Sequence, residues 1–166
     1  MIEQERKEDD RGYFSRVFCE REFAEQGLKT KFVQGSVSFN RSKGTLRGMH
    51  FQASPMQETK LVCCTQGAIF DVMIDLRPDS STYKQHQAIE LSAGNGTMLY
   101  IPEGFAHGFQ TLQDDTGVYY QMTEFFAPAL ARGVRWDDPA FGIEWPPIAG
   151  ARIILDRDRN YPLFQG

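Results

Sequence analysis

The sequence predicts an all-β fold, a β-sandwich or jelly roll formed by a single domain over residues 1–166. Glycine, proline, serine and asparagine recur along the chain and separate short runs of β-favouring residues. Several of these runs alternate apolar and polar side chains, which is the period of a strand with two different faces. The only early helix that the pattern supports is short, so helices are expected only at the periphery of the sheets.

The first predicted element is a helix at about 20–26, and Gly27 is its natural end. The next is a strand at 32–39, whose polar face carries Gln34, Ser36 and Ser38 and whose apolar face carries Val33, Val37 and Phe39. Further strands are predicted at 61–64, 68–76, 98–101 and 117–126. The tail after Asp137 is rich in proline and charge, with helical turns expected near Leu155. A fold of this kind can leave a pocket between its sheets, and inward polar residues belong there.

The composition excludes several classes of function. A net charge of −4 gives no general case for nucleic-acid binding, although a few arginines in one cleft can still hold an anionic small ligand. No apolar run is long enough to span a membrane. The three cysteines lack Cys-x-x-Cys spacing and form no disulfide framework, and Cys63 and Cys64 lie in an apolar run. These features predict a cytoplasmic protein with reduced thiols.

The segment from Gly44 to Gln52 places a cation and one of only three histidines in a β-rich stretch. His50 is either a half-buried strand residue with a hydrogen-bonded ring or a group that moves protons, for which histidine is well suited near neutral pH. In a regular strand Arg47 and His50 would face opposite sides. If both serve one pocket, Gly48 should mark a bulge or kink.

Jelly rolls can hold iron, zinc or manganese, so a metal site is one alternative. The usual ligand set needs a His-x-His pair, a carboxylate and a further histidine. The residue two after His50 is Gln52, and the other histidines are His86 and His107. The sequence therefore favours a site without a metal ion, and a metal-dependent site stays the less favoured alternative.

Tyrosines and arginines supply the remaining candidates. Tyr120 shares its strand face with Val118 and Met122, whereas Tyr119 points the other way. Either tyrosine can be core packing with a satisfied hydroxyl, or a proton donor if it reaches a pocket. Arg11 and Arg47 can be surface charges or phosphate binders, because guanidinium matches phosphate geometry.

Several blocks of the sequence, in order, resemble the dTDP-4-dehydrorhamnose 3,5-epimerase family, metal-free jelly rolls of the cupin type that act on nucleotide-linked 4-keto-6-deoxyhexoses. The resemblance covers nearly the whole chain. The matching blocks are Asp10-Arg11-Gly12-Tyr13-Phe14, 46–52, Lys60-Leu61-Val62, Asp71-Val72, Asp75-Leu76-Arg77, 101–109, Trp136-Asp137-Asp138-Pro139 and Trp145-Pro146.

The resemblance implies roles for eleven residues. His50 would remove the proton beside the ketone, Asp158 would orient that histidine, Lys60 would stabilise the enolate oxygen, and Tyr120 would return a proton on the opposite face. The implied substrate-binding residues are Arg11, Phe14, Gln34, Arg47, Gln52, His107 and Phe125. It further implies a homodimer that takes a nucleoside-diphosphate sugar, with no cofactor, nucleic acid or membrane as partner.

The chain departs from the family pattern mainly in its nucleotide-recognition residues. Arg16 stands where a glutamate is usual, Ser36 where an asparagine is usual, and Phe125 and Phe126 where tyrosines are frequent. The segment before the Arg11 block is short for the family, which predicts a weaker dimer or a more open nucleotide site. The resulting hypothesis is an isomerase that inverts C3, C5 or both through an enolate. The alternatives are a catalytically silent jelly roll that binds nucleotide sugars and a metal-dependent cupin.

Overall fold

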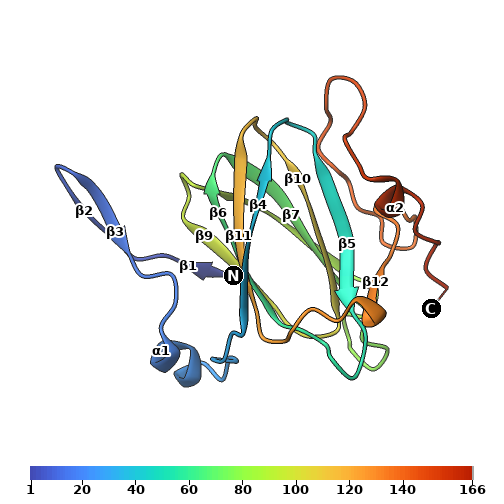
Figure 1. Cartoon of the computed structure of the whole chain (residues 1–166), viewed down its shortest axis with the longest axis horizontal. Helices are drawn as coiled ribbons and strands as arrows, with labels where there is room; N and C mark the ends of the chain where they lie inside the picture. Colours follow the sequence, from blue (N-terminus) through green and yellow to red (C-terminus); the bar gives the residue numbers. More distant parts are fainter. Residues whose placement is uncertain (166) are drawn as a thin grey trace.

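Two five-stranded antiparallel sheets face each other in the computed structural model, which describes residues 1–165 (Figure 1). The strands of the first sheet are β1 (Ile2–Glu3), β4 (Gln34–Asn40), β6 (Lys60–Gln66), β9 (Thr97–Ile101) and β11 (Thr116–Met122). Those of the second are β5 (Leu46–Gln52), β7 (Ala68–Asp75), β8 (His86–Ser92), β10 (Phe105–Thr111) and β12 (Ala131–Gly133). The first sheet has the order β1-β9-β6-β11-β4 and the second β12-β5-β10-β7-β8. The predicted all-β class is confirmed.

The remaining elements lie outside the two sheets. Strands β2 (Arg6–Asp9) and β3 (Gly12–Ser15) form a hairpin that projects from one end of the molecule (Figure 1). Helix α1 (Glu20–Glu25) follows the hairpin, and a 3₁₀ turn η1 (Pro128–Leu130) precedes β12. Helix α2 (Asp156–Arg159) lies beside β5 near the C-terminus. No helix of the described chain is long and apolar enough to cross a membrane.

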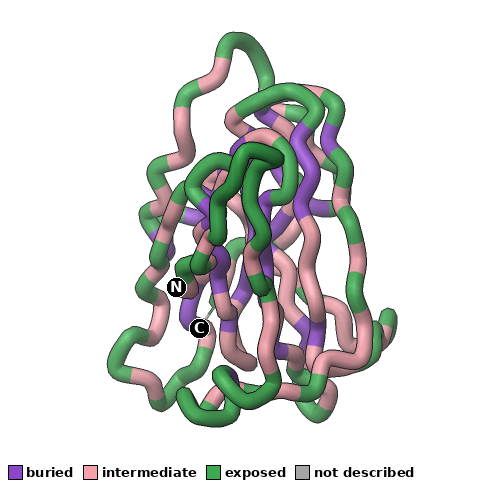
Figure 2. The backbone as a smooth tube through the Cα atoms, turned by 90° about the vertical axis from the view of Figure 1, so that its left-hand side faces the viewer, coloured by how far each residue is buried: buried purple, intermediate pink, exposed green. Residues whose placement is uncertain are grey.

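The main core lies between the sheets, where side chains from both meet. It contains Val62, Ile69, Leu91, Leu99 and Val118, each fully or almost fully buried. Figure 2 shows these buried segments in the middle of the strands, with the connecting loops exposed. Because apolar packing fills one part of the space between the sheets, the polar residues of the same faces are left to line the rest.

Each sheet is also covered on part of its outer face. Phe23 of α1 packs with Leu61, Cys63 and Met98 over the first sheet. The segment from 134 to 164 covers the second sheet through residues such as Phe141. Both faces of the central strands are therefore buried, so their sequences read as continuous apolar runs.

The predicted elements agree with the structure wherever the sequence pattern is strong. The helix predicted at 20–26 is α1, and Gly27 follows its end with a φ of +68°. The five predicted strands correspond to β4, β6, β7, β9 and β11, with ends that differ by a few residues. On β4 the polar face points inward, while Val37 and Phe39 are exposed on the outer face of this edge strand.

Candidate functional site

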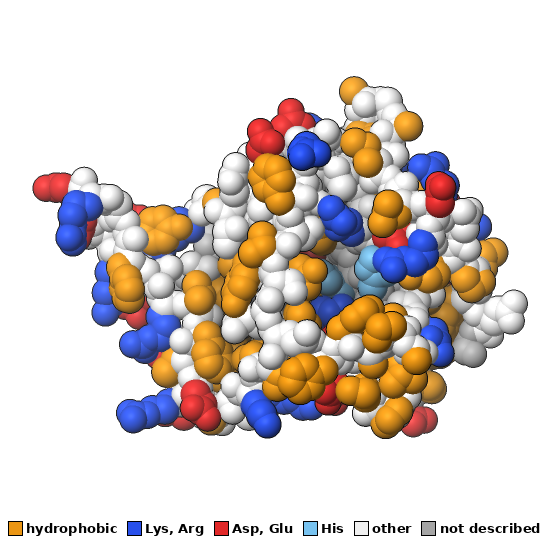
Figure 3. All heavy atoms as spheres, in the orientation of Figure 1, with side chains coloured by type: hydrophobic (Ala, Val, Ile, Leu, Met, Phe, Trp, Pro, Cys, Tyr) orange, Lys and Arg blue, Asp and Glu red, His pale blue; other side chains and the backbone are white. Residues whose placement is uncertain are grey.

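A cavity with two adjoining lobes opens between the sheets. Its smaller lobe has a volume of about 250 Å³ and its larger lobe about 470 Å³. Four side chains line both lobes: His50, Lys60, Tyr120 and Arg157. Figure 3 shows histidine side chains at the floor of a hollow that is bordered by cationic and apolar side chains.

His50 forms a dyad with a buried carboxylate. Its Nε2 lies 2.8 Å from Oδ1 of Asp158, and the two side chains are 32% and 2% exposed. An ionised carboxylate can only accept hydrogen bonds, so Nε2 carries the proton of this pair. The other ring nitrogen, Nδ1, then keeps its lone pair and can act as a base.

The C-terminal tail brings Asp158 to His50, although the two are far apart in sequence. Ile153 forms an isolated parallel bridge with Thr45, and its carbonyl accepts the N–H of Leu46. The tail therefore runs along the start of β5 before α2 begins at Asp156. This path places Asp158 under the middle of β5, where Oδ2 also accepts the N–H of Gly48 at 3.2 Å.

The environment of Asp158 keeps it ionised. Burial raises the pKa of its carboxyl, but the hydrogen bond and charge of His50 lower it. The N–H of Gly48 and the guanidinium of Arg157, whose Nε donates to Oδ1 at 3.1 Å, lower it further. The net pKa of Asp158 lies below its ordinary value of 3.8, so the carboxylate is charged at neutral pH.

A bulge at Gly48 turns Arg47 and His50 towards the same cavity, as the sequence predicts. The register between β5 and β10 shifts between the pairs His107–His50 and Phe109–Arg47. Gly48 has a φ of +135°, which L side chains rarely adopt. A Cβ at this position would lie 2.6 Å from the Cα of Gly108, so only glycine allows the strands to approach.

The opposite wall of the cavity comes from the first sheet. Tyr120 of β11 faces the cavity and packs against the main core, while Tyr119 faces the cluster under α1, as their alternation predicts. Lys60, the first residue of β6, has its Nζ 3.1 Å from Oε1 of Glu58, and both side chains are mostly buried. One wall thus offers a histidine–carboxylate dyad and the facing wall a cation and a phenol.

A second histidine–carboxylate pair lies beside the first. His107 of β10 is the cross-strand neighbour of His50, and its Nε2 lies 2.7 Å from Oδ1 of the fully buried Asp71. The other carboxylate oxygen of Asp71 has no hydrogen-bond partner within the described chain. His107 also lines the smaller lobe, so this pair presents a second polar ring to the same cavity.

Comparisons with known proteins identify the family. The family model described as dTDP-4-dehydrorhamnose 3,5-epimerase matches residues 1–166. A protein of that name from Methanothermobacter thermautotrophicus is 45% identical over 162 residues, which are 97% of this chain and 86% of the relative. The chain belongs to this family. The predicted family and enzyme class, an isomerase, are confirmed.

Two solved structures of relatives agree with this assignment. The Bacillus anthracis 3,5-epimerase, crystallised with TDP and pyrophosphate, has a TM-score of 0.94 and 42% identity and covers 98% of this chain and 91% of its own. A 3′-monoepimerase from Streptomyces bikiniensis, in complex with dTDP-quinovose, has a TM-score of 0.91 and 30% identity. It covers 98% of this chain and 81% of its own. The same fold therefore occurs in a relative named as a 3,5-epimerase and in a relative named as a 3′-monoepimerase.

The structure gathers most of the predicted site residues around the epimerase-like cavity. The predicted residues in its lining are Gln34, Arg47, His50, Gln52, Lys60, His107, Tyr120 and Asp158. Arg47 is held by its Nε, which donates to Oδ1 of the buried Asn40 at 2.8 Å. Gln52 lines the larger lobe, but both ends of its amide bond to backbone groups of neighbouring loops.

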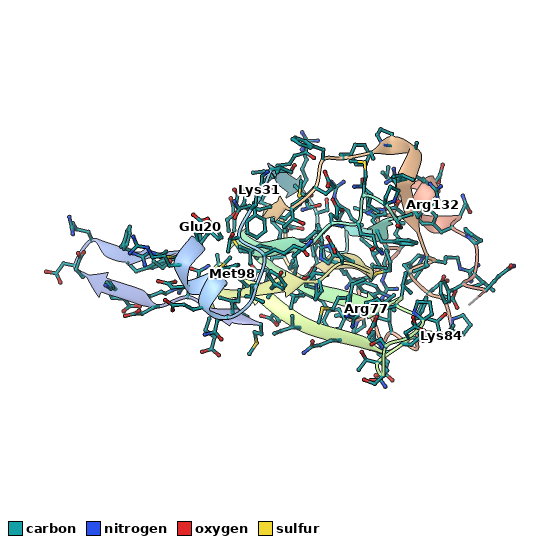
Figure 4. The ribbon with its side chains drawn as sticks, turned by 90° about the horizontal axis from the view of Figure 1, so that it is seen from below. Glu20, Lys31, Arg77, Lys84, Met98 and Arg132 are labelled. Carbon is teal, nitrogen blue, oxygen red and sulfur yellow. The ribbon has the colours of Figure 1, made fainter. Side chains whose placement is uncertain are left out.

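Three of the predicted site residues lie outside the cavity lining of their own chain. Arg11 and Phe14 lie on the β2–β3 hairpin, where Arg11 pairs with Asp9 and Phe14 is 71% exposed. Figure 4 places Arg132, which lines the larger lobe, at the end of the molecule opposite to the hairpin and α1. The side chain of Phe125 is exposed and outside the lining, which instead includes Phe126. Adjacent residues of an extended segment point in opposite directions, and the sequence alone does not show which of the two faces inward.

The lining also contains residues that were not predicted as site residues, among them Arg157, Glu58 and Tyr161. Arg157 and Glu58 stand next to predicted residues, one before Asp158 and two before Lys60, and this proximity is the signal that could have found them. Tyr161 packs over Gly133, where any Cβ would lie 2.3 Å from its ring, and its ring centroid is 6.0 Å from that of His50. Burial raises the pKa of Tyr161. Its place depends on the fold of the tail, for which the sequence carries no periodic signal.

The cavity is positively charged although the chain is acidic. Its lining includes the cations Arg47, Lys60, Arg132 and Arg157 and the carboxylates Glu58 and Asp158. This excess of cations suits a ligand with a diphosphate group. In the described chain no three His, Cys, Asp or Glu residues gather in an arrangement that could hold a metal ion.

Proposed function

We propose that this protein epimerises a nucleotide-linked 4-keto-6-deoxyhexose at C3, C5 or both. The observation that carries the proposal is the placement of the His50–Asp158 dyad and of Lys60 and Tyr120 on facing walls of one cavity. Inversion of a carbon centre needs a base on one face of the sugar and an acid on the other. Side chains on two opposed sheets meet that need.

Lys60 is proposed to stabilise the enolate. A ketone at C4 acidifies the C–H groups at C3 and C5, because the carbanion delocalises onto the ketone oxygen. A cation placed at that oxygen stabilises the developing charge, and one such donor contributes about 3–4 kcal/mol. The ion pair with Glu58 holds the Lys60 ammonium at the cavity wall, which reduces the reorganisation needed when the charge develops.

His50 is proposed to take the proton through Nδ1. Its charge after protonation is offset by the ionised Asp158, which stabilises the imidazolium and fixes the ring orientation. Tyr120 then delivers a proton to the opposite face of the enolate carbon. Every group in this sequence is a side chain of the cavity, so the proposal includes no cofactor.

The substrate carrier is proposed to be thymidine diphosphate, on the basis of the named relatives. Arg47 and Arg157 lie in the lining and can bind the diphosphate. Phe126, at the larger lobe, can stack on a nucleobase. Whether one or two centres are inverted depends on how the enolate is held, since relatives of both kinds share the fold.

The experiment is proton NMR of the protein with dTDP-4-keto-6-deoxyglucose in D₂O. We expect the signals at C3, C5 or both to disappear as deuterium enters, and the epimerised product to form. His50→Ala is the matched variant, and it should abolish exchange while binding of dTDP persists. Binding of dTDP without exchange in the wild-type protein would instead identify a nucleotide-sugar-binding protein without catalysis.

We also propose a homodimer in which the β2–β3 hairpin of one copy completes the nucleotide end of the partner's cavity. Arg11 and Phe14, which the family resemblance assigns to the substrate, belong to the β2–β3 hairpin and are absent from the cavity lining of their own chain. Phe14 is exposed at the projecting hairpin, and Val37 and Phe39 are exposed on the edge strand β4. A second copy can cover these apolar side chains and place the hairpin beside its own cavity.

Complementation tests this arrangement. Two inactive chains are co-expressed and purified as a mixed dimer: one carries His50→Ala, and the other carries Arg11→Ala and Phe14→Ala. If the hairpin acts in the partner, the mixed dimer contains one intact site and recovers about half of the wild-type activity. If the hairpin serves its own chain, every site carries a defect and the mixed dimer is inactive. Sedimentation of the wild-type protein establishes the oligomeric state independently.

A cytoplasmic location is proposed from the thiols. Cys63 and Cys64 are buried, and burial raises the pKa of Cys64 to about 11. Such thiols behave as small apolar side chains, and all three cysteines are free. Fractionation of the native cells, with detection of the protein in the soluble cytoplasmic fraction, tests this proposal.

A further inference from the structure

The segment that carries Phe125 and Phe126 connects β11 to the 3₁₀ turn and borders the larger lobe of the cavity. Phe126 belongs to the lining although its side chain is 61% exposed. An aromatic ring with so little packing around it is not held in place by its own contacts. The backbone of the segment therefore decides the point from which the ring projects towards the lobe.

Gln52, the last residue of β5, binds this backbone on both sides of Phe126. Its Nε2 donates to the carbonyl of Phe125 at 3.0 Å and to the carbonyl of Met56 at 2.6 Å. Its Oε1 accepts the N–H of Ala127 at 2.8 Å. A primary amide has two N–H donors, and both are used here. Gln52 is only 4% exposed and has no N–H group left for a ligand.

Gln34 binds the same segment from the opposite sheet. It is the first residue of β4, and its Oε1 accepts the N–H of Phe126 at 2.6 Å. Two glutamines from facing sheets thus hold three backbone groups at consecutive residues, 125 to 127. Fixing one residue's backbone costs about 1–2 kcal/mol of conformational entropy, and these hydrogen bonds offset that cost before a ligand arrives.

We propose that Gln52, assisted by Gln34, is a positioning residue that presents Phe126 as a stacking wall for the nucleobase, and that Gln52 itself does not touch the substrate. This inference rests on the proposed function, because it requires a nucleotide in the larger lobe. It corrects the direct role that the family resemblance implied for Gln52. In this role, Gln52 affects the affinity for the nucleotide and not the rate of proton transfer.

A double-mutant cycle between Gln52 and Phe126 tests the proposal, with dTDP as the probe in titration calorimetry. Gln52→Met keeps the length of the side chain and removes its three hydrogen bonds. Base stacking on an aromatic side chain is strong enough that both Gln52→Met and Phe126→Ala should weaken dTDP binding roughly tenfold. The double variant should bind no more weakly than Phe126→Ala, because the glutamine acts only through that ring.

Two further substitutions, one of them also combined with Phe126→Ala, and a kinetic readout sharpen the test. Phe125→Ala removes the neighbouring ring outside the lining and should leave dTDP affinity unchanged. Gln34→Met removes a single hydrogen bond at a partly exposed position, so it keeps the proposal testable if Gln52→Met unfolds. Its effect should also vanish in the Phe126→Ala background. In Gln52→Met, KM for the nucleotide sugar should rise while kcat for exchange stays within about twofold of the wild type.

Different results would overturn the positioning role of Gln52 and the proposed epimerase function. A loss of affinity from Gln52→Met that persists in full in the Phe126→Ala background would show direct contact with the ligand and overturn the positioning role. An unchanged affinity in both glutamine variants would overturn it as well. Binding of dTDP by the wild-type protein without proton exchange would instead refute the proposed function alone.

Discussion

Replacement of Asp158 by asparagine tests the dyad most directly, because it removes a charge and hardly any volume. Oδ1 accepts from His50 and from Arg157, and Oδ2 accepts from the N–H of Gly48. An asparagine has one accepting oxygen and one donating NH₂ group in place of two acceptors. In either orientation of its amide, at least one of the three donors therefore meets another donor.

The magnitude depends on which orientation asparagine takes. With its oxygen towards His50 the tautomer survives, but a charge-assisted hydrogen bond worth about 1.5–3 kcal/mol is lost, which lowers the rate roughly 10- to 150-fold. With its NH₂ group towards His50 the ring proton moves to Nδ1 and the base is lost, which lowers the rate about 10⁴-fold. We expect a decrease between these limits, with dTDP affinity within about twofold of the wild type.

The assay is deuterium incorporation under single-turnover conditions, with urea unfolding to measure the stability of each variant. Asp138→Asn is the matched control, since Asp138 is a buried carboxylate outside the cavity that accepts the N–H groups of Ala140 and Phe164. It should lose stability but retain exchange. Exchange at the wild-type rate in Asp158→Asn would refute the dyad, and an equal loss in both variants would show a general effect of instability.

Three other perturbations have defined outcomes. Tyr120→Phe should retain deuterium exchange while inversion falls about 10²-fold or more, and an equal fall in both by NMR would remove its distinct role as an acid. Gly48→Ala should destabilise the protein by about 2–5 kcal/mol in urea unfolding, because its Cβ meets the backbone of Gly108 at 2.6 Å and its φ of +135° is strained. The hydrogen bonds of Arg77 lower the pKa of the buried Asp75 below 3.8 despite the opposing effect of burial, so the unfolded chain takes up this proton first and stability is lost as pH falls below about 4. Asp75→Asn should therefore flatten the decline in unfolding free energy between pH 5 and 3 by about 1 kcal/mol, and an unchanged slope would contradict the assignment.

The sequence predicts strands well where one face is apolar and poorly where packing partners decide. Alternation marks β4 and β7, whereas β10 escapes because Gly104 and Gly108 resemble loop punctuation. Gly108 lies within β10, and this strand position needs glycine because a Cβ there would lie 2.7 Å from the carbonyl oxygen of Arg47 on the neighbouring strand. The sequence shows a glycine, which is unfavourable inside a strand. It does not show the close approach of the neighbouring strand that makes glycine necessary.

The same division applies to the site. Once Arg47 and His50 are assumed to serve one pocket, their opposite parity predicts the bulge at Gly48, because strand geometry is local. The meeting of Asp158 with His50 depends on a tail that runs beside β5, and only the family resemblance supplies it at the sequence level. The sequence does not predict the hydrogen bonds between the Gln52 amide and the neighbouring loops, because each partner is a backbone group, which every residue has.

A motif shared with the family therefore carries two kinds of information that only geometry separates. The block from Lys60 and the block around His50 bring side chains into the cavity, where chemistry is possible. The Trp136-Asp137-Asp138-Pro139 block instead builds the cover of the second sheet, because Asp138 accepts two backbone N–H groups and the carbonyl of Trp136 accepts the indole N–H of Trp145. Both kinds of block support the assignment of the family. Only the first supports a mechanism, and within it the free hydrogen-bonding groups of each side chain decide whether the residue can meet a substrate.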